Sequence, residues 1–231
     1  MSNGSTERSL EIAQSLSQVR ERISRAALDA GRTSDEITLI AVTKTYPISD
    51  VQILAALGVS NFGENREAEG RQKSEIIPAQ WHFQGEIQSK KISSIAKWAS
   101  VIHSLDDGGH ALRLNRAVID EKKLSVFIQV NLDGSSGRGG VNGQAIEPLA
   151  EIVANLENLH LEGLMVVAPL GENPESAFSK MAEIHSVFIR TFPDSQALSM
   201  GMSGDFEVAI GYGATHIRIG SSILGSRFAA L

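Results

Sequence analysis

The 231-residue chain contains no cysteine, which excludes disulfides and thiolate metal sites. It also has no apolar run near the roughly 18 residues of a membrane helix, and its first residues lack the basic start and apolar core of a signal peptide. Its net charge is −6, and no run of Lys and Arg is longer than two residues. We therefore expect a cytoplasmic protein that binds neither nucleic acid nor a membrane.

The composition is typical of a soluble globular domain, with 42% hydrophobic and 21% charged residues. Residues 1–6 are small and polar, and we expect them to form a disordered start. Residues 7–231 are then predicted to form one domain, whose length suits a single α/β barrel. Its first element is an expected helix from Glu7 to near Gly31, because apolar residues recur there at helical spacing.

After this helix, short apolar runs alternate with longer amphipathic ones. The short runs predict eight strands, at 37–42, 59–62, 80–83, 101–103, 125–130, 160–167, 196–198 and 216–219. The longer runs predict helices at 49–57, 64–76, 87–99, 110–121, 143–156, 174–190 and 204–211. Strict alternation is typical of parallel βα units, and eight of these close into a (β/α)8 TIM-type barrel with an extra N-terminal helix. An open, doubly wound sheet is the alternative.

A lysine stands at the end of the first predicted strand, in the stretch "LIAVTKTYP". Active groups of a barrel lie at the carboxyl ends of its strands, and lysine is rarely buried unless it is paired or used in chemistry. A desolvated Lys44 amine would have a lowered pKa and would react with aldehydes. A salt-bridged lysine at a strand end fits the pattern equally well.

Two loops rich in serine and glycine follow the seventh and eighth strands, in "SMGMSGD" and "RIGSS". Barrels frequently bind phosphate between these loops, and free N–H groups at a helix start favour an anion. We predict a phosphate cup formed by Ser203, Gly204, Gly220 and Ser221. Either loop alone would be an ordinary turn or helix cap. Together with a reactive lysine, the cup suggests an aldehyde that carries a phosphate, such as pyridoxal 5'-phosphate.

Arg218 lies two residues before Gly220, so alternation along the strand places both on the barrel-facing side. A protonated arginine there would donate to the pyridine nitrogen and keep it unprotonated. The ring would then be a weaker electron sink than one paired with a carboxylate. An ion pair at the barrel mouth is the alternative role for Arg218.

Five segments carry a family resemblance: "AVTKTYP", "FGENR", "WHFQGEIQSKK", "LSMGMSGDFEVAI" and "GATHIRIGSSILGSR". In order and spacing they resemble the YggS/PROSC family of pyridoxal-phosphate-binding homeostasis proteins, which is related to the N-terminal barrel of alanine racemase. The resemblance covers residues 37–227. It implies that Lys44 forms an aldimine with pyridoxal 5'-phosphate and that Arg218 pairs with the ring nitrogen. The other implied cofactor-binding residues are Asn65, His82, Met202, Ser203, Gly204, Gly220 and Ser221. We assign no catalytic residue and no metal site.

The chain departs from the family pattern at three outer positions. Tyr46 replaces the second lysine of "KTKP", Arg66 replaces the tyrosine of "FGENY", and Arg138 takes the basic place in the loop after "QVN". These changes leave the cofactor cradle intact. They put in doubt any secondary cofactor site that the outer residues serve.

The resemblance implies a monomeric protein that buffers pyridoxal 5'-phosphate and delivers it to apoenzymes without turnover. The alternative is an amino-acid racemase, which needs acid and base groups on both faces of the cofactor. Alanine racemase takes one of these from an additional domain, for which we expect no room here, and the only tyrosines are Tyr46 and Tyr212. A third possibility is an enzyme that acts on a phosphorylated sugar or aldehyde through Lys44.

Overall fold

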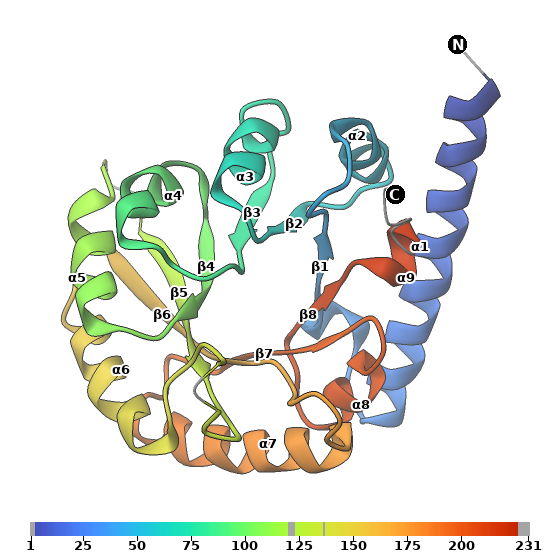
Figure 1. Ribbon diagram of the computed structural model, residues 1–231. Helices are drawn as coiled ribbons and strands as arrows, with labels where there is room; N and C mark the ends of the chain where they lie inside the picture. The colour runs from blue at the N-terminus through green and yellow to red at the C-terminus, as the bar shows by residue number, and fades with distance from the viewer. Residues whose placement is uncertain (1–2, 120–122, 136, 226–231) are drawn as a thin grey trace.

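Eight parallel strands close into a barrel in the computed structural model, which describes residues 3–119, 123–135 and 137–225 (Figure 1). Each strand pairs with the next one in the chain, and the last pairs with the first. The strands are β1 (Thr38–Val42), β2 (Asn61–Glu64), β3 (Gln80–Phe83), β4 (Val101–Leu105), β5 (Leu124–Val130), β6 (Leu159–Val166), β7 (Ala197–Met202) and β8 (His216–Ile219). The closed order confirms the predicted (β/α)8 barrel and excludes the open sheet.

Helices surround the barrel and connect its strands (Figure 1). In the described residues they are α1 (Asn3–Asp29), α2 (Ile48–Ala56), α3 (Glu67–Ser74), α4 (Ile92–Trp98), α5 (Gly108–Ala117), α6 (Ile146–Ala154), α7 (Pro174–Thr191), α8 (Phe206–Gly211) and α9 (Ser221–Leu224). Three single 3₁₀ turns, at Ser34–Glu36, Ser89–Lys91 and Gly143–Ala145, complete the set. None of the helices in this described part is long and apolar enough to cross a membrane.

The extra N-terminal helix α1 packs along the outside of the barrel against α2, α8 and α9 (Figure 1). Its apolar stripe is buried through Ile12, Leu16, Val19 and Ile23, each at most 4% exposed. The helix begins at Asn3, so the expected disorder up to residue 6 is corrected for residues 3–6.

Several strand boundaries differ from the expected ones by one to four residues, and one of them changes the site. Strand β2 begins at Asn61 rather than Val59. Strand β7 runs on to Met202, so the first four residues of the "SMGMSGD" segment are strand rather than loop. Gly201 permits this because its φ of 92° is open to glycine, and a Cβ there would run into Ala209 and Phe206 of α8. The close packing of α8 therefore fixes where β7 ends and where the loop that follows it begins.

The core has two parts of different character. The layer between strands and helices is apolar, with Phe62, Trp81 and Phe83 almost completely buried. Inside the barrel lie buried polar side chains as well, among them His103 and Ser199. Buried polar groups need hydrogen-bond partners, and the interior chain of such bonds leads to the candidate site.

Candidate functional site

A cavity of about 680 Å³ opens at the carboxyl ends of the strands. Every predicted cofactor-binding residue except His82 lines it. The lining residues are Val42, Lys44, Tyr46, Asn65, Gln84, Met165, Val167, Met202, Ser203, Gly204, Arg218, Gly220, Ser221 and Gly225. The barrel thus brings together residues from both ends of the sequence, at the face where barrel enzymes carry their active sites.

Lys44 lies in the turn that follows β1 and is half-buried on the cavity wall. The Tyr46 backbone N–H donates to the Thr43 carbonyl at 3.0 Å, which closes the turn around Lys44. The Tyr46 hydroxyl donates to the Gly225 carbonyl at 2.6 Å. Tyr46 therefore joins the lysine turn to the end of α9.

The predicted phosphate cup is built by two loops that Ser203 holds together. Its hydroxyl oxygen accepts from the backbone N–H of Gly220 at 3.2 Å and of Ser222 at 3.3 Å. A Cβ on Gly220 would come within 3.3 Å of the Val42 carbonyl oxygen, whereas one on Gly204 would meet nothing within 4 Å. Small residues thus line this wall, with Ser221 at the start of α9 beside them.

Arg218 is 5% exposed and is fixed in the barrel interior by two hydrogen bonds. One guanidinium nitrogen, Nη1, donates to the Ser199 hydroxyl at 2.7 Å, and Nη2 donates to the Val166 carbonyl at 2.8 Å. Burial lowers the pKa of Arg218 to about 10, although the Asp205 carboxylate opposes this shift. The group therefore stays protonated at neutral pH, as a donor at the cavity wall must be.

The structure corrects the position of His82, which was expected on the pocket wall. Its side chain lies inside the barrel, 2% exposed, and is not among the residues lining the cavity. Gln84 lines the cavity instead. Residues 82 and 84 point to the same side of an extended segment, and Gln84 lies past the end of β3, nearer the barrel mouth.

His82 belongs to a chain of hydrogen bonds that crosses the barrel interior. The Ser199 hydroxyl lies 2.9 Å from Nδ1 of His103, and Nε2 of His103 lies 2.9 Å from Nδ1 of His82. Nε2 of His82 lies 3.0 Å from Oδ1 of Asn61. With Arg218 as the first donor and both histidines neutral, every bond can run in one direction, from Arg218 to Asn61.

Burial keeps both histidines of this chain neutral. It lowers the pKa of His82 to about 3. It also lowers the pKa of His103 well below its usual range, and the Arg218 charge lowers it further, as would a proton on His82. Sequence analysis missed the roles of His103 and Ser199, because they come from β4 and β7 and nothing in the sequence pairs them.

Two buried polar atoms at the cavity have no hydrogen-bond partner in the part of the chain that the structure describes. They are Oδ1 of Asn65, an acceptor, and Nε2 of Gln84, a donor. Two glycines make room for these residues: a Cβ on Gly63 would crowd the Gln84 side chain, and one on Gly85 would collide with the Asn65 carbonyl. Buried polar groups without partners are rare in folded proteins, so these atoms fit a polar ligand.

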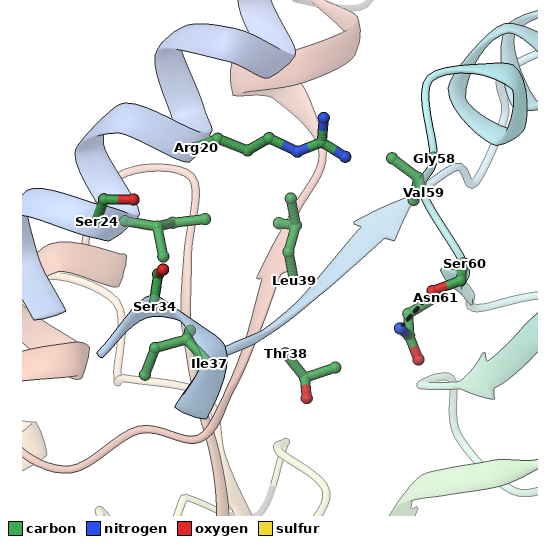
Figure 2. A pocket seen from close by; sticks show the side chains of 11 residues that line it. Arg20, Ser24, Ser34, Ile37, Thr38, Leu39, Gly58, Val59, Ser60 and Asn61 are labelled. Atoms are coloured by element: carbon green, nitrogen blue, oxygen red, sulfur yellow. Dashed lines mark hydrogen bonds between the residues drawn. The ribbon is translucent and has the colours of Figure 1, made fainter. Parts of the chain in front are cut away.

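A second cavity, of about 460 Å³, lies at the opposite end of β1 and β2 (Figure 2). Arg20 of α1 extends over it (Figure 2). Its Nη2 donates to the Leu57 carbonyl at 3.2 Å. It is lined mainly by hydroxyl, amide and aliphatic groups and contains no lysine. Residues at this end of a barrel serve stability, and we therefore place the functional site at the carboxyl ends.

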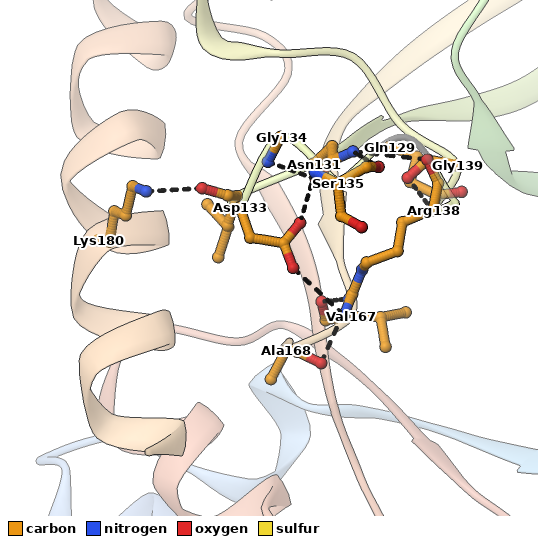
Figure 3. Close-up of polar contacts among 11 residues, drawn as sticks. Gln129, Asn131, Asp133, Gly134, Ser135, Arg138, Gly139, Val167, Ala168 and Lys180 are labelled. Carbon is orange, nitrogen blue, oxygen red and sulfur yellow. Dashed lines mark hydrogen bonds and ion pairs between the residues drawn. The ribbon is translucent and has the colours of Figure 1, made fainter. Parts of the chain in front are cut away.

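The loop between β5 and α6 is held down by Arg138 (Figure 3). Its Nη2 donates to the Val167 carbonyl at 2.6 Å and the Ala168 carbonyl at 3.3 Å. Lys180 of α7 donates to the Leu132 carbonyl of the same loop at 2.7 Å (Figure 3). Because Val167 lines the cavity, the basic residue at this altered position anchors the loop beside the site.

The described residues contain no group of three or more histidine and acidic side chains placed to hold a metal ion. The fold and the site together define a (β/α)8 barrel protein that presents a lysine, an arginine and a serine–glycine cup to one cavity at its strand ends.

The chain belongs to the alanine racemase N-terminal domain family, whose model matches residues 14–227. It is 40% identical to the pyridoxal phosphate homeostasis protein of Corynebacterium glutamicum, over 90% of this chain and 99% of that protein. It is 36% identical to the protein of the same name from Escherichia coli K12, over 94% of this chain and 97% of that one. These similarities confirm the family resemblance drawn from the sequence motifs.

Solved structures show the same fold. PipY of Synechococcus elongatus PCC7942, described with PLP bound, superposes with a TM-score of 0.81 at 28% identity, covering 93% of this chain and all of that one (100%). Alanine racemase from Corynebacterium glutamicum superposes with a TM-score of 0.73 at 16% identity, and the match covers 96% of this chain and 62% of the racemase. The racemase comparison shows a shared barrel alone.

Proposed function

We propose that this protein binds pyridoxal 5'-phosphate in the carboxyl-end cavity, through Lys44, and serves cytoplasmic homeostasis of the cofactor without turning over a substrate. The observation that carries this proposal is the convergence of Lys44, Arg218 and the Ser203–Ser221 cup on one cavity. The names of the relatives and the PLP-bound PipY structure support it.

The residues around the cavity fit the chemical groups of this cofactor. Its aldehyde condenses reversibly with a primary amine and releases water. Lys44 can supply this amine. The small residues of the cup leave room for a phosphate, and protonated Arg218 suits an unprotonated pyridine nitrogen. Asn65 and Gln84 offer one acceptor and one donor that lack partners within the described chain.

A carrier role agrees better with this cavity than racemisation does. A racemase moves protons on both faces of its cofactor, and Tyr46 is the one tyrosine among the described residues of the cavity wall. Its hydroxyl already donates to the Gly225 carbonyl. We propose that apoenzymes receive the cofactor from a monomeric carrier.

The purified protein loaded with pyridoxal 5'-phosphate should absorb visible light, and borohydride should fix the cofactor to Lys44. Under these conditions alanine and other amino acids should not racemise, as followed by chiral chromatography over hours. Steady racemisation that disappears in Lys44→Ala would favour the enzyme over the carrier. Absence of any cofactor binding would reject both.

The phosphate cup can be tested with Ser221→Glu. This change sets a negative charge beside the phosphate, and repulsion of about 1–3 kcal/mol would weaken binding by roughly ten- to a hundredfold. Titration followed by absorbance measures the dissociation constant. Pyridoxal, which has no phosphate, is the matched ligand and should bind both proteins about equally. Unchanged affinity for the phosphorylated form would move the cup elsewhere in the cavity.

A further inference from the structure

The turn that carries Lys44 contains a strained backbone position. Thr45 has a φ of 69°, the only positive φ among the described residues other than glycine. It occupies the third position of the turn that Tyr46 N–H and the Thr43 carbonyl close. Turns with a positive φ at this position favour glycine or asparagine, and a β-branched residue there is a genuine outlier. Such a conformation persists only when its surroundings impose it.

Thr43, the residue before Lys44, forms four hydrogen bonds. Its N–H donates to the Gly63 carbonyl at 3.0 Å, and its hydroxyl donates to the Glu64 carboxylate at 2.7 Å. The carbonyl of Thr43 accepts from the Lys73 amine at 2.8 Å, in addition to the turn bond from Tyr46. The backbone therefore enters the turn in one defined orientation.

Thr45, the residue after Lys44, is bound by a residue of α3, the helix that also carries Lys73. The Thr45 N–H donates to the Glu69 carboxylate at 2.7 Å, and Glu69 lies 3.8 Å from the Lys73 amine. Lys73 in turn pairs with Glu64 at 2.6 Å. Glu64 is 0% and Lys73 4% exposed, so this ion pair is desolvated and its hydrogen bonds are directional.

We propose that Glu69, supported by the Glu64–Lys73 ion pair, is a positioning residue that keeps the Lys44 turn in its strained form. Without the bond from Glu69, Thr45 would relax to a negative φ. That change would rotate the Lys44–Thr45 peptide and redirect the amine away from its place on the cavity wall. This inference rests on the proposed function, because it concerns the amine that bonds to the cofactor.

Glu69→Ala is the direct test, since it removes the acceptor and leaves the buried Glu64–Lys73 pair intact. Loss of a charge-assisted hydrogen bond of typical strength would reduce the population of the competent turn about tenfold. The apparent dissociation constant for pyridoxal 5'-phosphate would rise by the same factor. Pyridoxine 5'-phosphate carries an alcohol in place of the aldehyde and does not need the amine. Its affinity should stay unchanged.

Thr45→Gly should rescue the loss, because glycine adopts a positive φ without help. The double variant Glu69→Ala/Thr45→Gly should bind pyridoxal 5'-phosphate nearly as tightly as the unaltered protein. Glu69→Gln should also retain affinity, because its amide oxygen can accept from the Thr45 N–H. Glu75→Ala is the matched control: Glu75 lies at the end of the same helix, 64% exposed, and pairs only with Arg71 in the described structure.

Three outcomes would overturn the proposal: normal affinity in Glu69→Ala, an equal loss for both ligands, or a loss that Thr45→Gly does not restore. Thermal unfolding of each variant shows whether the barrel is intact. If the double variant fails to fold, the comparison of Glu69→Ala with Glu69→Gln decides instead. Failure of the unaltered protein to bind either ligand would reject the proposed function itself, which separates that result from the others.

Discussion

Lys44→Ala is expected to abolish borohydride-stable attachment of pyridoxal 5'-phosphate and the absorption band of the covalently attached cofactor. The amine is the one lysine nitrogen that the described residues bring to the cavity wall, so no other group can replace it. The phosphate cup and Arg218 remain, and the variant should still bind the cofactor noncovalently and release it faster on a desalting column. Because Lys44 is only half-buried, its free energy of unfolding should change by no more than about 1 kcal/mol.

Two further variants separate the roles of the residues around Lys44. Lys90→Ala is the matched control, since Lys90 is exposed in a 3₁₀ turn outside the cavity lining, and its attachment of the cofactor should be normal. Arg218→Ala should still attach the cofactor covalently, with a shifted spectrum because the ring nitrogen has lost its donor. A normal covalent product in Lys44→Ala would contradict the assignment and direct peptide mapping to other lysines.

The alternation of short and long apolar runs predicted parallel βα units, and the count of eight favoured a barrel over an open sheet. Closure itself is seen only in the structure. The lysine and the serine–glycine loops could be predicted because barrel topology places every strand's carboxyl end at one face. The order of the strands was enough to predict that Lys44 and the two loops lie at one face of the barrel.

The sequence could not predict how far along the barrel axis each inward-facing side chain lies. His82 and Gln84 alternate to the same side, but which of them reaches the cavity depends on the tilt and register of β3 against its neighbours. The contacts that Glu64, Glu69 and Lys73 make with the Lys44 turn could not be predicted either. In the sequence these residues have the pattern of an ordinary charged helix face. Burial of the Glu64–Lys73 pair between β2 and α3 distinguishes it, and burial is a property of the assembled layers.

The interior histidines predict steep loss of stability in acid. Burial lowers the pKa of His82 to about 3 and of His216 to about 4, and lowers that of His103 well below its usual range. Nearby charges act as well: Arg218 lowers the pKa of His103 and His216, whereas Glu162 raises that of His216. In the unfolded chain each of these histidines titrates near pH 6.5.

The sign of the effect follows from proton binding. Below about pH 6.5 the unfolded chain binds protons that the folded protein excludes, so the free energy of unfolding falls as the pH is lowered. Above about pH 7 the free energy of unfolding does not depend on these histidines. Their contribution to the slope ends as the pH falls past the folded pKa values, near 4 for His216 and near 3 for His82. Three such histidines give a slope of about 4 kcal/mol per pH unit between pH 5.5 and 4.5.

Reversible urea unfolding at pH 7.5, 6.0, 5.5 and 5.0 measures this dependence. His216→Gln removes one titrating group and should reduce the slope by about 1.4 kcal/mol per pH unit, whereas His160→Gln, at an exposed position, should leave it unchanged. Equal slopes in all three proteins would contradict the buried, neutral state of His216. Because His103 contacts Ser199, which in turn accepts from Arg218, protonation of this chain would place a second cation beside Arg218. The folded protein excludes this proton until the pH approaches the folded pKa values, near 3 for His82, so affinity for the cofactor should begin to fall only at a lower pH than stability does.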